Sequence, residues 1–519
     1  MKKTIITVWI GFGMMAASCT EELDQHPSGL LTDSNYFQTE DDAVTAVDGV
    51  YAILVHSDKN TPLYGDQILY LSDLTSDYMR AGANSNSPET RAISSVGYDA
   101  GNFEIQCTWE QIYKGIARAN IAVDNIPNVN ASDEVRQRLI NEAKFLRALL
   151  YFNAVQFWGD IPLVKSSEYS AEDLNRHPVE DVYDFIIRDL EDASALPPEQ
   201  SAAGRATGGS ADALLARVYL VHSSLSGANA ASDLNSAVQY AYRVINSGRY
   251  ELFANFYDAF DPAKKNGKEH IFSAQFAYGQ DNGFSGNSAQ HCTWSTGFNQ
   301  NEPVLIITDL DLFYNSYAEG DQRRDGSYAK RLYNPADNST FEFDLPRFRK
   351  LIDTVYGANW LASAINVPVI RYADVYFTLA EALNELGGPD SEHNGISAYD
   401  ALNEIRRRAF REGKYSAGAD SPGTPPYAHD LSGLTKESFR DVLQQERYFE
   451  FVLEQTRWFD LVRWKKLVTS VSRTKPAVSV RNYRFPIPHS ERLLNPEGLW
   501  QNYGYDGATV SNPYDESYK

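Results

Sequence analysis

The sequence predicts a mainly α-helical protein, a tetratricopeptide-like scaffold of helical hairpins with long loops and minor β-hairpins. Two observations lead to this fold class. Apolar residues recur at spacings of three and four in several segments of the 519-residue chain, as they do along one face of a helix. These segments also follow one another in pairs separated by a break, which is typical of stacked helical hairpins.

The clearest helical segment is EAKFLRALLYFNAVQFWG, in which Leu146, Leu150 and Phe157 share one face. Gly159 follows the last apolar residue and marks the end of the helix. Alanines along the helical segments allow neighbouring helices to approach closely. The predicted pairs are 141–158 with 179–195, 211–224 with 235–247, and 371–386 with 397–410, and one further helix is predicted at 109–126.

Three segments between and around the helices differ in composition. Residues 78–104, 276–302 and 353–366 are rich in Gly, Asn and Ser, and they are too long to be simple connections. Long loops in compact domains are usually functional or disordered. Scattered Tyr, Trp and Phe in these three segments argue against disorder, because disordered segments are poor in aromatic residues.

Composition excludes some classes of function. The formal net charge is −22, and such a negative surface repels nucleic acid and anionic lipid. After the first 30 residues no segment approaches 18 consecutive apolar residues, so no membrane span is predicted. Cys107 and Cys292 are the cysteines that follow Cys19, and the sequence leaves open whether they pair.

The first residues predict export. Lys2 and Lys3 precede an uncharged apolar run that ends at Ala17, and this run is too short to span a bilayer. Cys19 follows small residues, as in the lipobox of bacterial lipoproteins, and the acidic residues after it resemble surface-export signals of Bacteroidetes lipoproteins. We therefore expect Cys19 to be lipidated and the protein to be anchored in the outer membrane, facing outward. A plain secretory signal is the alternative.

The predicted organisation follows from these observations. Residues 1–18 are a lipoprotein signal peptide, and 19–40 are a lipidated tether and the start of the mature chain. Residues 41–519 form a single helical domain, with an N-terminal part at about 41–255 and a C-terminal part at about 256–519.

Three motifs, in this order, resemble the SusD/RagB family of surface lipoproteins. They are NEAKFLRALLYFNAVQFWGDIPLV (141–164), QQERYFEFVLEQTRWFDLVRW (444–464) and RFPIPHSERLLNPEGLWQNYGY (484–505). The resemblance implies the SusD-like α/α fold. It also implies a non-catalytic protein that captures oligosaccharide or polysaccharide and passes it to a SusC-like TonB-dependent transporter. RagB-like members serve peptide uptake, so a peptide ligand is the alternative within the family.

The glutamates of the second motif are interpreted as structural. Glu446, Glu450, Glu454 and Arg457 follow spacings of four, four and three, which predicts one helix face and an ion-paired packing seam. A surface glycoside hydrolase would instead need two carboxyl groups on either side of an open cleft. No catalytic residue is predicted.

No cofactor or metal is predicted either. DSEHNG (390–395) copies the first half of a calcium loop, but Ala401 stands where the bidentate glutamate belongs, so a connection between two helices is predicted. The histidines show no ligand spacing, and sequence motifs of metalloproteases, serine hydrolases and P-loop enzymes are missing.

Candidate ligand-binding residues come from the Gly/Asn/Ser-rich loops. Aromatic rings there can lie under the apolar face of a sugar while polar groups bind its hydroxyls. Trp294 and Trp360 are the principal candidates, because Trp109, Trp158, Trp458, Trp464 and Trp500 lie in helical or family motifs and are predicted to be core. The other candidates are the aromatic residues Tyr78, Tyr98, Phe284 and Tyr356 and the polar residues Arg80, Asn84, Asp281 and Asn282.

The same loops permit other functions. A peptide site would need hydrogen bonding along an edge strand rather than an aromatic platform. A helical-repeat scaffold that binds only protein would use Trp294 and Trp360 at an interface. Isolated aromatic residues among Asn and Gly favour the glycan.

Overall fold

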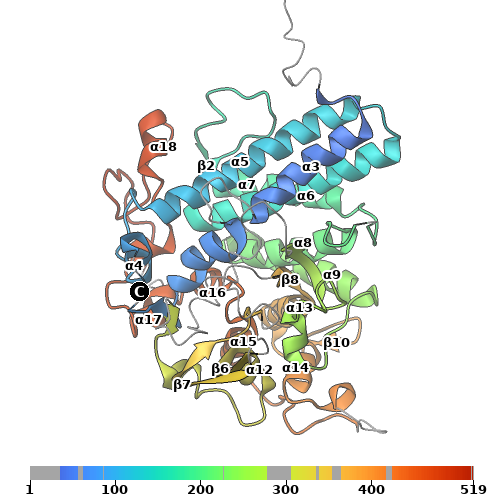
Figure 1. Ribbon diagram of the computed structural model, residues 1–519, viewed down its shortest axis with the longest axis vertical. Helices are drawn as coiled ribbons and strands as arrows, with labels where there is room; N and C mark the ends of the chain where they lie inside the picture. The colour runs from blue at the N-terminus through green and yellow to red at the C-terminus, as the bar shows by residue number, and fades with distance from the viewer. Residues whose placement is uncertain are drawn as a thin grey trace, which may run out of the picture.

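The computed structural model confirms the mainly helical fold class (Figure 1). No described helix combines the length and the apolar character needed to cross a membrane. The structure describes residues 36–55, 62–83, 85, 87–200, 202–225, 227–276, 305–334, 338–353, 364–416, 424–515 and 517.

Eight helices form four consecutive antiparallel pairs. Each helix packs on the next along the chain, and the first helix of each pair also contacts the first helix of the following pair. This pattern is that of stacked tetratricopeptide-like hairpins. The pairs are α3 (Glu40–Val55) with α5 (Phe103–Asn125), α6 (Asp133–Trp158) with α7 (Val179–Ala193), α8 (Gly208–Ser223) with α9 (Ala230–Asn246), and α13 (Tyr372–Gly387) with α14 (Ala398–Ala409).

The three predicted pairs are therefore confirmed. The helix predicted at 109–126 is α5, which begins earlier, at Phe103. Its partner α3 was not predicted. Figure 1 shows α3, α5 and α6 side by side at one end of the molecule and α13 and α14 toward the other.

Local sequence explains where these helices start and how closely they pack. Ser132 caps α6 by accepting a hydrogen bond from the Val135 N–H. Gly159 ends the same helix with a φ of 75°, a left-handed conformation that favours glycine. A Cβ atom at Gly115 of α5 would stand 2.5 Å from the Leu150 side chain, so any larger residue there requires Leu150 to move where α5 crosses α6.

Helices of the C-terminal third cover one side of this stack. The helix α15 packs on α13, and α16 packs on the short helical turn at Tyr70–Leu74. These helices are α15 (Lys436–Phe451), α16 (Arg457–Arg463), α17 (Leu467–Val471) and α18 (His489–Leu494), and the shorter helices elsewhere are α4 (Pro88–Ser94), α11 (Leu310–Phe313) and α12 (Gln322–Ser327).

The strands form small two-stranded antiparallel sheets. Two of these sheets join distant parts of the chain: β1 (Met79–Ala81) with β5 (Leu305–Ile307), and β4 (His270–Ala274) with β8 (Val367–Arg371). The other sheets connect nearer segments. They are β2 (Ile161–Pro162) with β3 (Arg176–His177), β6 (Tyr328–Asn334) with β7 (Ser339–Phe348), and β9 (Glu392–His393) with β10 (Ile396–Ser397).

The segment DSEHNG folds as the predicted connection between two helices. It contributes β9 and the turn to β10, and this hairpin joins α13 to α14. Asn394 and Gly395 occupy the turn with φ values of 50° and 80°, as an Asn-Gly hairpin turn requires.

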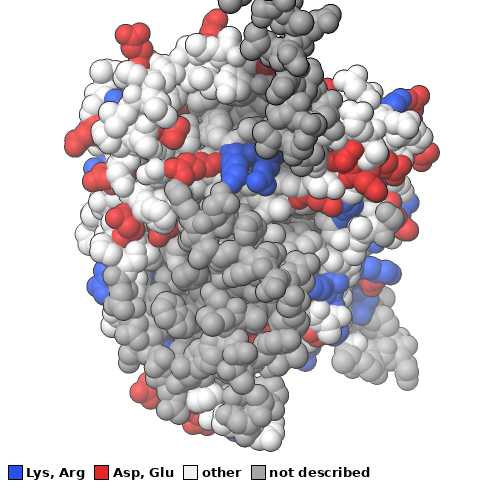
Figure 2. All heavy atoms as spheres, turned by 45° about the horizontal axis from the view of Figure 1, so that its top comes forward, with Lys and Arg blue, Asp and Glu red and all other residues white. Residues whose placement is uncertain are grey.

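The core runs through the helix pairs and the C-terminal helices. Trp109, Trp158 and Trp458 are buried in it, as predicted. Trp464 and Trp500 are only partly buried, so their assignment to the core was too simple. Acidic side chains are spread over the upper described part of the face in Figure 2, with basic side chains in a few clusters, in keeping with the negative net charge.

Candidate functional site

A surface groove of about 590 Å³ lies where β1, β5 and β7 meet. In the β1–β5 pair Arg80 stands opposite Ile306, between the buried Met79 and the half-buried Ala81. Because side chains alternate along a strand, Arg80 points outward and lines the groove. Arg80 forms no hydrogen bond or ion pair with any described residue, so its guanidinium is available to a ligand.

The opposite wall of the groove is the strand β7. Phe341 and Phe343 are half-buried and alternate with the exposed carboxylates of Glu342 and Asp344. Leu345, at the end of this alternation, is 60% exposed. The groove therefore offers aromatic rings beside hydrogen-bond acceptors and two guanidinium groups, those of Arg80 and of Arg347, which lies 4.8 Å from the centre of the Phe343 ring. This combination suits a polyhydroxylated ligand.

The aromatic residues of β7 were missed in the sequence analysis. The run STFEFDLP alternates apolar and polar residues, which is the pattern of a half-buried strand. This alternation was the signal that would have identified Phe341 and Phe343 as neighbours on one face.

The segments that flank the two Trp-bearing loops lie together on the scaffold. The Phe276 N–H donates a hydrogen bond of 2.9 Å to Oδ1 of Asn366, so described residues close to 277–304 and to 354–363 are in contact. The Ala364 N–H donates one of 2.9 Å to Oδ2 of Asp353, which links the described residues on either side of 354–363. Leu305, the first described residue after 277–304, pairs with Ala81, which is next to Arg80.

Most predicted ligand-binding residues lie outside the described part of the chain, as does the predicted lipidation site. The buried Cys107 is described but Cys292 is not, so their pairing stays untested. The undescribed candidates are Trp294, Trp360, Asn84, Asp281, Asn282, Phe284, Tyr356 and, for lipidation, Cys19.

Tyr78 does not belong to a ligand-binding surface, and this prediction was wrong. Its side chain is 1% exposed, and its ring packs edge-on against Phe313, Phe348 and Tyr448. The hydroxyl oxygen accepts a hydrogen bond of 3.0 Å from the Leu453 N–H. Burial raises the pKa of Tyr78 well above its ordinary value.

Tyr98 is corrected for the same reason. It is 1% exposed and stacks on Phe485, with the ring centroids 4.9 Å apart. Its hydroxyl accepts a hydrogen bond of 3.1 Å from Nδ2 of Asn482. Burial raises the pKa of Tyr98 to about 12. A ring enclosed in this way offers no face to a sugar.

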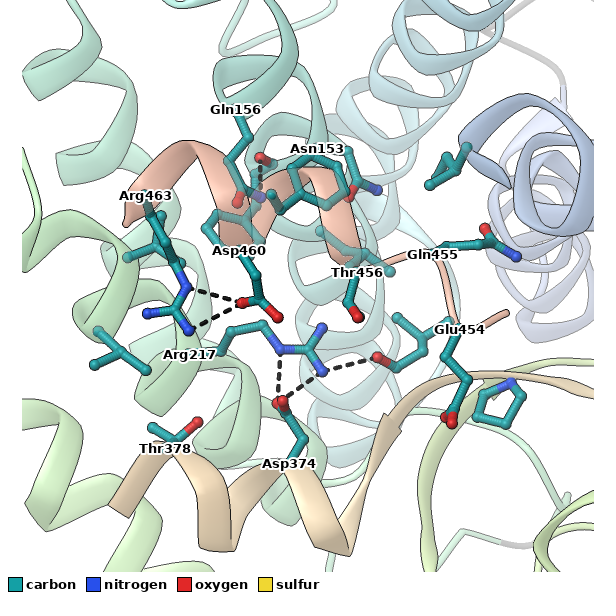
Figure 3. Close-up of a pocket in the computed structure, with 18 of the residues that line it drawn as sticks. Asn153, Gln156, Arg217, Asp374, Thr378, Glu454, Gln455, Thr456, Asp460 and Arg463 are labelled. Carbon is teal, nitrogen blue, oxygen red and sulfur yellow. Dashed lines mark hydrogen bonds and ion pairs between the residues drawn. The ribbon is translucent and has the colours of Figure 1, made fainter. Parts of the chain in front are cut away.

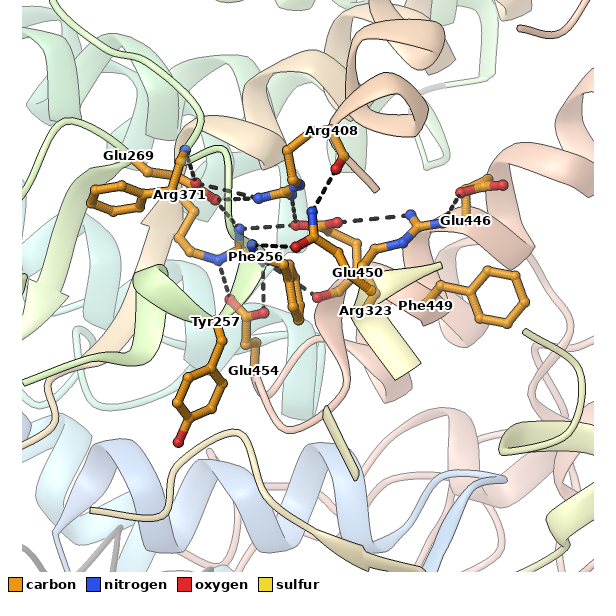
Figure 4. A network of polar contacts seen from close by, with 12 residues as sticks. Phe256, Tyr257, Glu269, Arg323, Arg371, Arg408, Glu446, Phe449, Glu450 and Glu454 are labelled. Atoms are coloured by element: carbon orange, nitrogen blue, oxygen red, sulfur yellow. Dashed lines mark hydrogen bonds and ion pairs between the residues drawn. The ribbon is translucent and has the colours of Figure 1, made fainter. Parts of the chain in front are cut away.

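The glutamates of the second motif lie in a buried network of charges (Figure 4). Glu450 is fully buried and contacts Arg371 at 3.0 Å, Arg408 at 2.5 Å and Arg323 at 3.8 Å. Burial opposes ionisation of Glu450, but the three guanidinium charges outweigh it and lower the pKa of Glu450 to about 2. Glu454 binds Arg371 at 2.6 Å. The predicted ion-paired seam is confirmed.

The geometry of this seam differs from the prediction. The helix α15 ends at Phe451 and α16 begins at Arg457, so Glu454 lies in the connection between the two helices and not on one helix face. Leu453 and Gln455 in this connection have φ values of 63° and 61°. Within the described residues these carboxylates are buried and held by arginines, whereas the acid–base pair of a glycoside hydrolase flanks an open cleft.

A second charged cluster surrounds a cavity of about 50 Å³ between α6, α8, α13 and α16 (Figure 3). Arg217 binds Asp374 at 2.8 Å, and Arg447 bridges Asp374 and Asp460 at 3.1 and 2.9 Å. Arg463 binds the other oxygen of Asp460 at 2.9 Å. Such a small cavity has room for a few water molecules. The alternating charges join four helices, and we interpret this cluster as structural.

Comparison with known proteins identifies the family. The model of the SusD family matches residues 288–505, and a second model, described as "Starch-binding associating with outer membrane", matches residues 31–220. The chain belongs to the SusD family. The N-terminal match includes β1 and the C-terminal match includes β5 and β7, so both halves of this SusD-family chain contribute to the groove.

Relatives cover nearly the whole chain. "SusD-like protein P25" of Formosa agariphila is 26% identical over 97% of this chain and 100% of its own. A SusD superfamily protein from Parabacteroides distasonis, solved by crystallography, is 25% identical, with a TM-score of 0.73 over 92% of this chain and 100% of that one. A laminarin-binding SusD-like protein shares the fold at 22% identity, with a TM-score of 0.67 over 90% and 100% of the two chains.

Proposed function

We propose that this SusD-family protein is a non-catalytic, cell-surface lipoprotein that captures oligosaccharide or polysaccharide and delivers it to a SusC-like TonB-dependent transporter. The observation that carries the proposal is the groove of about 590 Å³ at β1, β5 and β7, with Arg80 on one wall and Phe341 and Phe343 on the other. The description of the N-terminal family model as starch-binding and associated with the outer membrane supports it. The laminarin-binding relative supports the same ligand class.

We propose that the candidate segments 277–304 and 354–363 contribute to ligand binding. The segment 277–304, which carries Trp294, returns to the scaffold one residue from the partner of Arg80. The segment 354–363, which carries Trp360, shares its anchor at Asn366 with the start of 277–304. This arrangement supports a ligand-binding surface built from Arg80, the two loops and β7.

A binding role rather than catalysis accounts for the carboxylates. Glu342 and Asp344 of the groove are exposed to solvent, whereas the general acid of a glycosidase is usually desolvated. The buried glutamates of the second motif are occupied by arginines. Sequence supports the rest of the proposal: lipidation of Cys19 would tether the chain to the membrane in which a TonB-dependent transporter resides.

The experiment is native affinity electrophoresis of residues 20–519 in gels that contain neutral or acidic polysaccharides. We compare the parent protein with Arg80→Ala, Trp294→Ala and Trp360→Ala. Arg188→Ala serves as the matched control, because Arg188 is exposed on α7 and lines neither the groove nor the cavity. We expect one class of polysaccharide to retard the protein, with dissociation constants of roughly micromolar to millimolar, since a shallow exposed site gains little from desolvation.

The outcomes separate the alternatives. Loss of retardation in Arg80→Ala but not in Arg188→Ala supports the groove. Release of reducing ends from the polysaccharide by the pure protein would contradict the non-catalytic role. Retardation by no polysaccharide, together with binding of peptides, would replace the glycan with a peptide ligand.

A further inference from the structure

A second, more polar cleft lies on the other side of α11 from the groove. It measures about 190 Å³ and is enclosed by α11, α15, α16 and α17. Leu310 of α11 lines the groove, and Leu312, two residues further along, lines the cleft. Two residues of helix rise only about 3 Å, so the groove and the cleft are adjacent. Leu312 between them is 37% exposed.

The wall of this cleft presents polar groups that the described residues satisfy only in part. Gln444 is only 7% exposed, and its Oε1 accepts a hydrogen bond of 2.6 Å from Lys466. Its Nε2 donates no hydrogen bond to any described residue. The Ser470 hydroxyl of α17 is also without a hydrogen bond to the described residues. A nearly buried amide whose donor faces a cleft calls for a ligand or water in that cleft.

The charges in the cleft do not balance. Arg457 is held by both carboxylate oxygens of Asp77, at 2.9 and 2.7 Å, and Lys466 is held by Asp441 at 3.0 Å. Arg473 also lines the cleft, and it forms neither a hydrogen bond nor an ion pair with the described residues. One guanidinium therefore remains uncompensated, in a chain whose net charge is −22.

We propose that this cleft is a glycan subsite that takes one sugar residue carrying a single anionic substituent, a carboxylate or a sulfate ester. Arg473 binds the anionic group, since a guanidinium can donate two hydrogen bonds at once to the oxygens of a carboxylate or a sulfate ester. Gln444 and Ser470 bind ring hydroxyls, and the partly exposed indole of Trp464 supplies an apolar surface. The inference rests on the proposed function and narrows its ligand to a charged glycan.

The size of the cleft agrees with one sugar ring. A water molecule needs about 10–15 Å³ of such space, so about 190 Å³ accommodates roughly a dozen atoms the size of water. A hexuronate has about that number of non-hydrogen atoms, and an oligosaccharide has several times more. The rest of the chain of sugars would pass over Leu312 into the groove.

The test measures binding of glucuronate, glucose 6-sulfate and glucose to residues 20–519 by ligand-observed NMR titration. We compare the parent protein with Arg473→Gln, which removes the uncompensated charge, and with Ser470→Trp, which fills the cleft without changing charge. Arg188→Gln is the matched control, an exposed arginine on another helix. We expect one or both anionic sugars to bind about tenfold more tightly than glucose. Arg473→Gln is expected to abolish this preference, and Ser470→Trp to abolish binding, while Arg188→Gln changes neither.

The two acids identify the substituent. If the protein binds glucuronate more tightly than glucose 6-sulfate, the ligand of the cleft is a uronate. If it binds glucose 6-sulfate more tightly, the ligand is a sulfated sugar. Equal affinity for all three sugars, or a preference that survives Arg473→Gln, overturns the proposal. If that result comes with retardation by a neutral polysaccharide that depends on Arg80, the subsite is rejected and the proposed function stands. If no mono- or polysaccharide binds at all, both are rejected.

Discussion

Replacing Glu450 with glutamine removes the negative charge that three buried arginines share. Glu450 is fully buried, and it lies within 2.5 to 3.8 Å of Arg408, Arg371 and Arg323. Glutamine keeps the size of the side chain but leaves the three guanidinium groups with less opposing charge. Truncating one partner of a buried ion pair is strongly destabilising, by about 3–5 kcal/mol, because a buried charge then stands uncompensated.

The magnitude follows from the pKa of Glu450. The network lowers this pKa from 4.5 to about 2. A shift of one unit in a pKa corresponds to about 1.36 kcal/mol of free energy. The charged form of Glu450 therefore contributes about 3 kcal/mol to folding at neutral pH. Because the pKa in the folded state lies below the unfolded value, this contribution is complete above about pH 4.5. It is lost as the pH falls through about 2.

The assay is guanidinium chloride unfolding of residues 20–519 at pH 7 and at several lower pH values. We expect Glu450→Gln to lower the free energy of unfolding by about 3 kcal/mol at pH 7, with a difference that shrinks below pH 4.5. Glu251→Gln is the control, because Glu251 forms an exposed ion pair with Lys268 at 3.4 Å and such pairs contribute little. A loss below 0.5 kcal/mol in Glu450→Gln, or an equal loss in the control, would refute the reasoning.

Three further predictions concern packing, pH and the corrected tyrosine. Gly115→Val is expected to lower the free energy of unfolding by about 1–3 kcal/mol, because the valine side chain would meet Leu150. Gly49→Ala is the comparison: nothing lies within 4 Å of a Cβ atom there, so the same measurement should show a slight stabilisation of helix α3. Burial lowers the pKa of Lys475 from 10.5 to about 7, so between pH 7 and 10 the unfolded state binds a proton that the folded state does not. Raising the pH from 7 to 10 should therefore stabilise the parent protein relative to Lys475→Met in unfolding titrations. Equal changes of unfolding free energy with pH in the two proteins would contradict this. Tyr98→Phe should lower unfolding free energy by about 1 kcal/mol while leaving retardation by polysaccharide unchanged, and weakened retardation would restore Tyr98 to the ligand surface.

Helix pairing could be predicted because it depends on local periodicity. The helix α3 carried the same signal, with Ala43, Val47, Val50 and Leu54 buried at spacings of four, three and four, and was overlooked. The break between α15 and α16 could not be predicted in the same way. Glu454 and Arg457 keep the helical spacing across it, and the left-handed conformations of the connection follow from tertiary contacts.

The ligand-binding candidates likewise depend partly on local sequence and partly on contacts between residues far apart in the chain. Tyr78 and Tyr98 resemble loop aromatics in their local sequence, yet their partners Tyr448 and Phe485 lie more than 350 residues further along the chain. Arg80, chosen as a polar residue near loop aromatics, is exposed, and its role in ligand binding stays a prediction. Its position opposite β7 depends on the pairing of β1 with a strand more than 200 residues away. No local pattern in the sequence predicts that pairing.

The hydrogen bond between Ala364 and Asp353 has a consequence for how the family can diversify. It links Asp353 and Ala364, the described residues on either side of 354–363. Closing a longer loop on a fixed pair of ends is cheap in entropy, about 0.6 kcal/mol for a doubling of length. Insertions or wholesale exchange of this segment are therefore compatible with an unchanged scaffold. Under the proposed function, exchange of this segment would change ligand specificity without any change in the buried charges that hold the helices together.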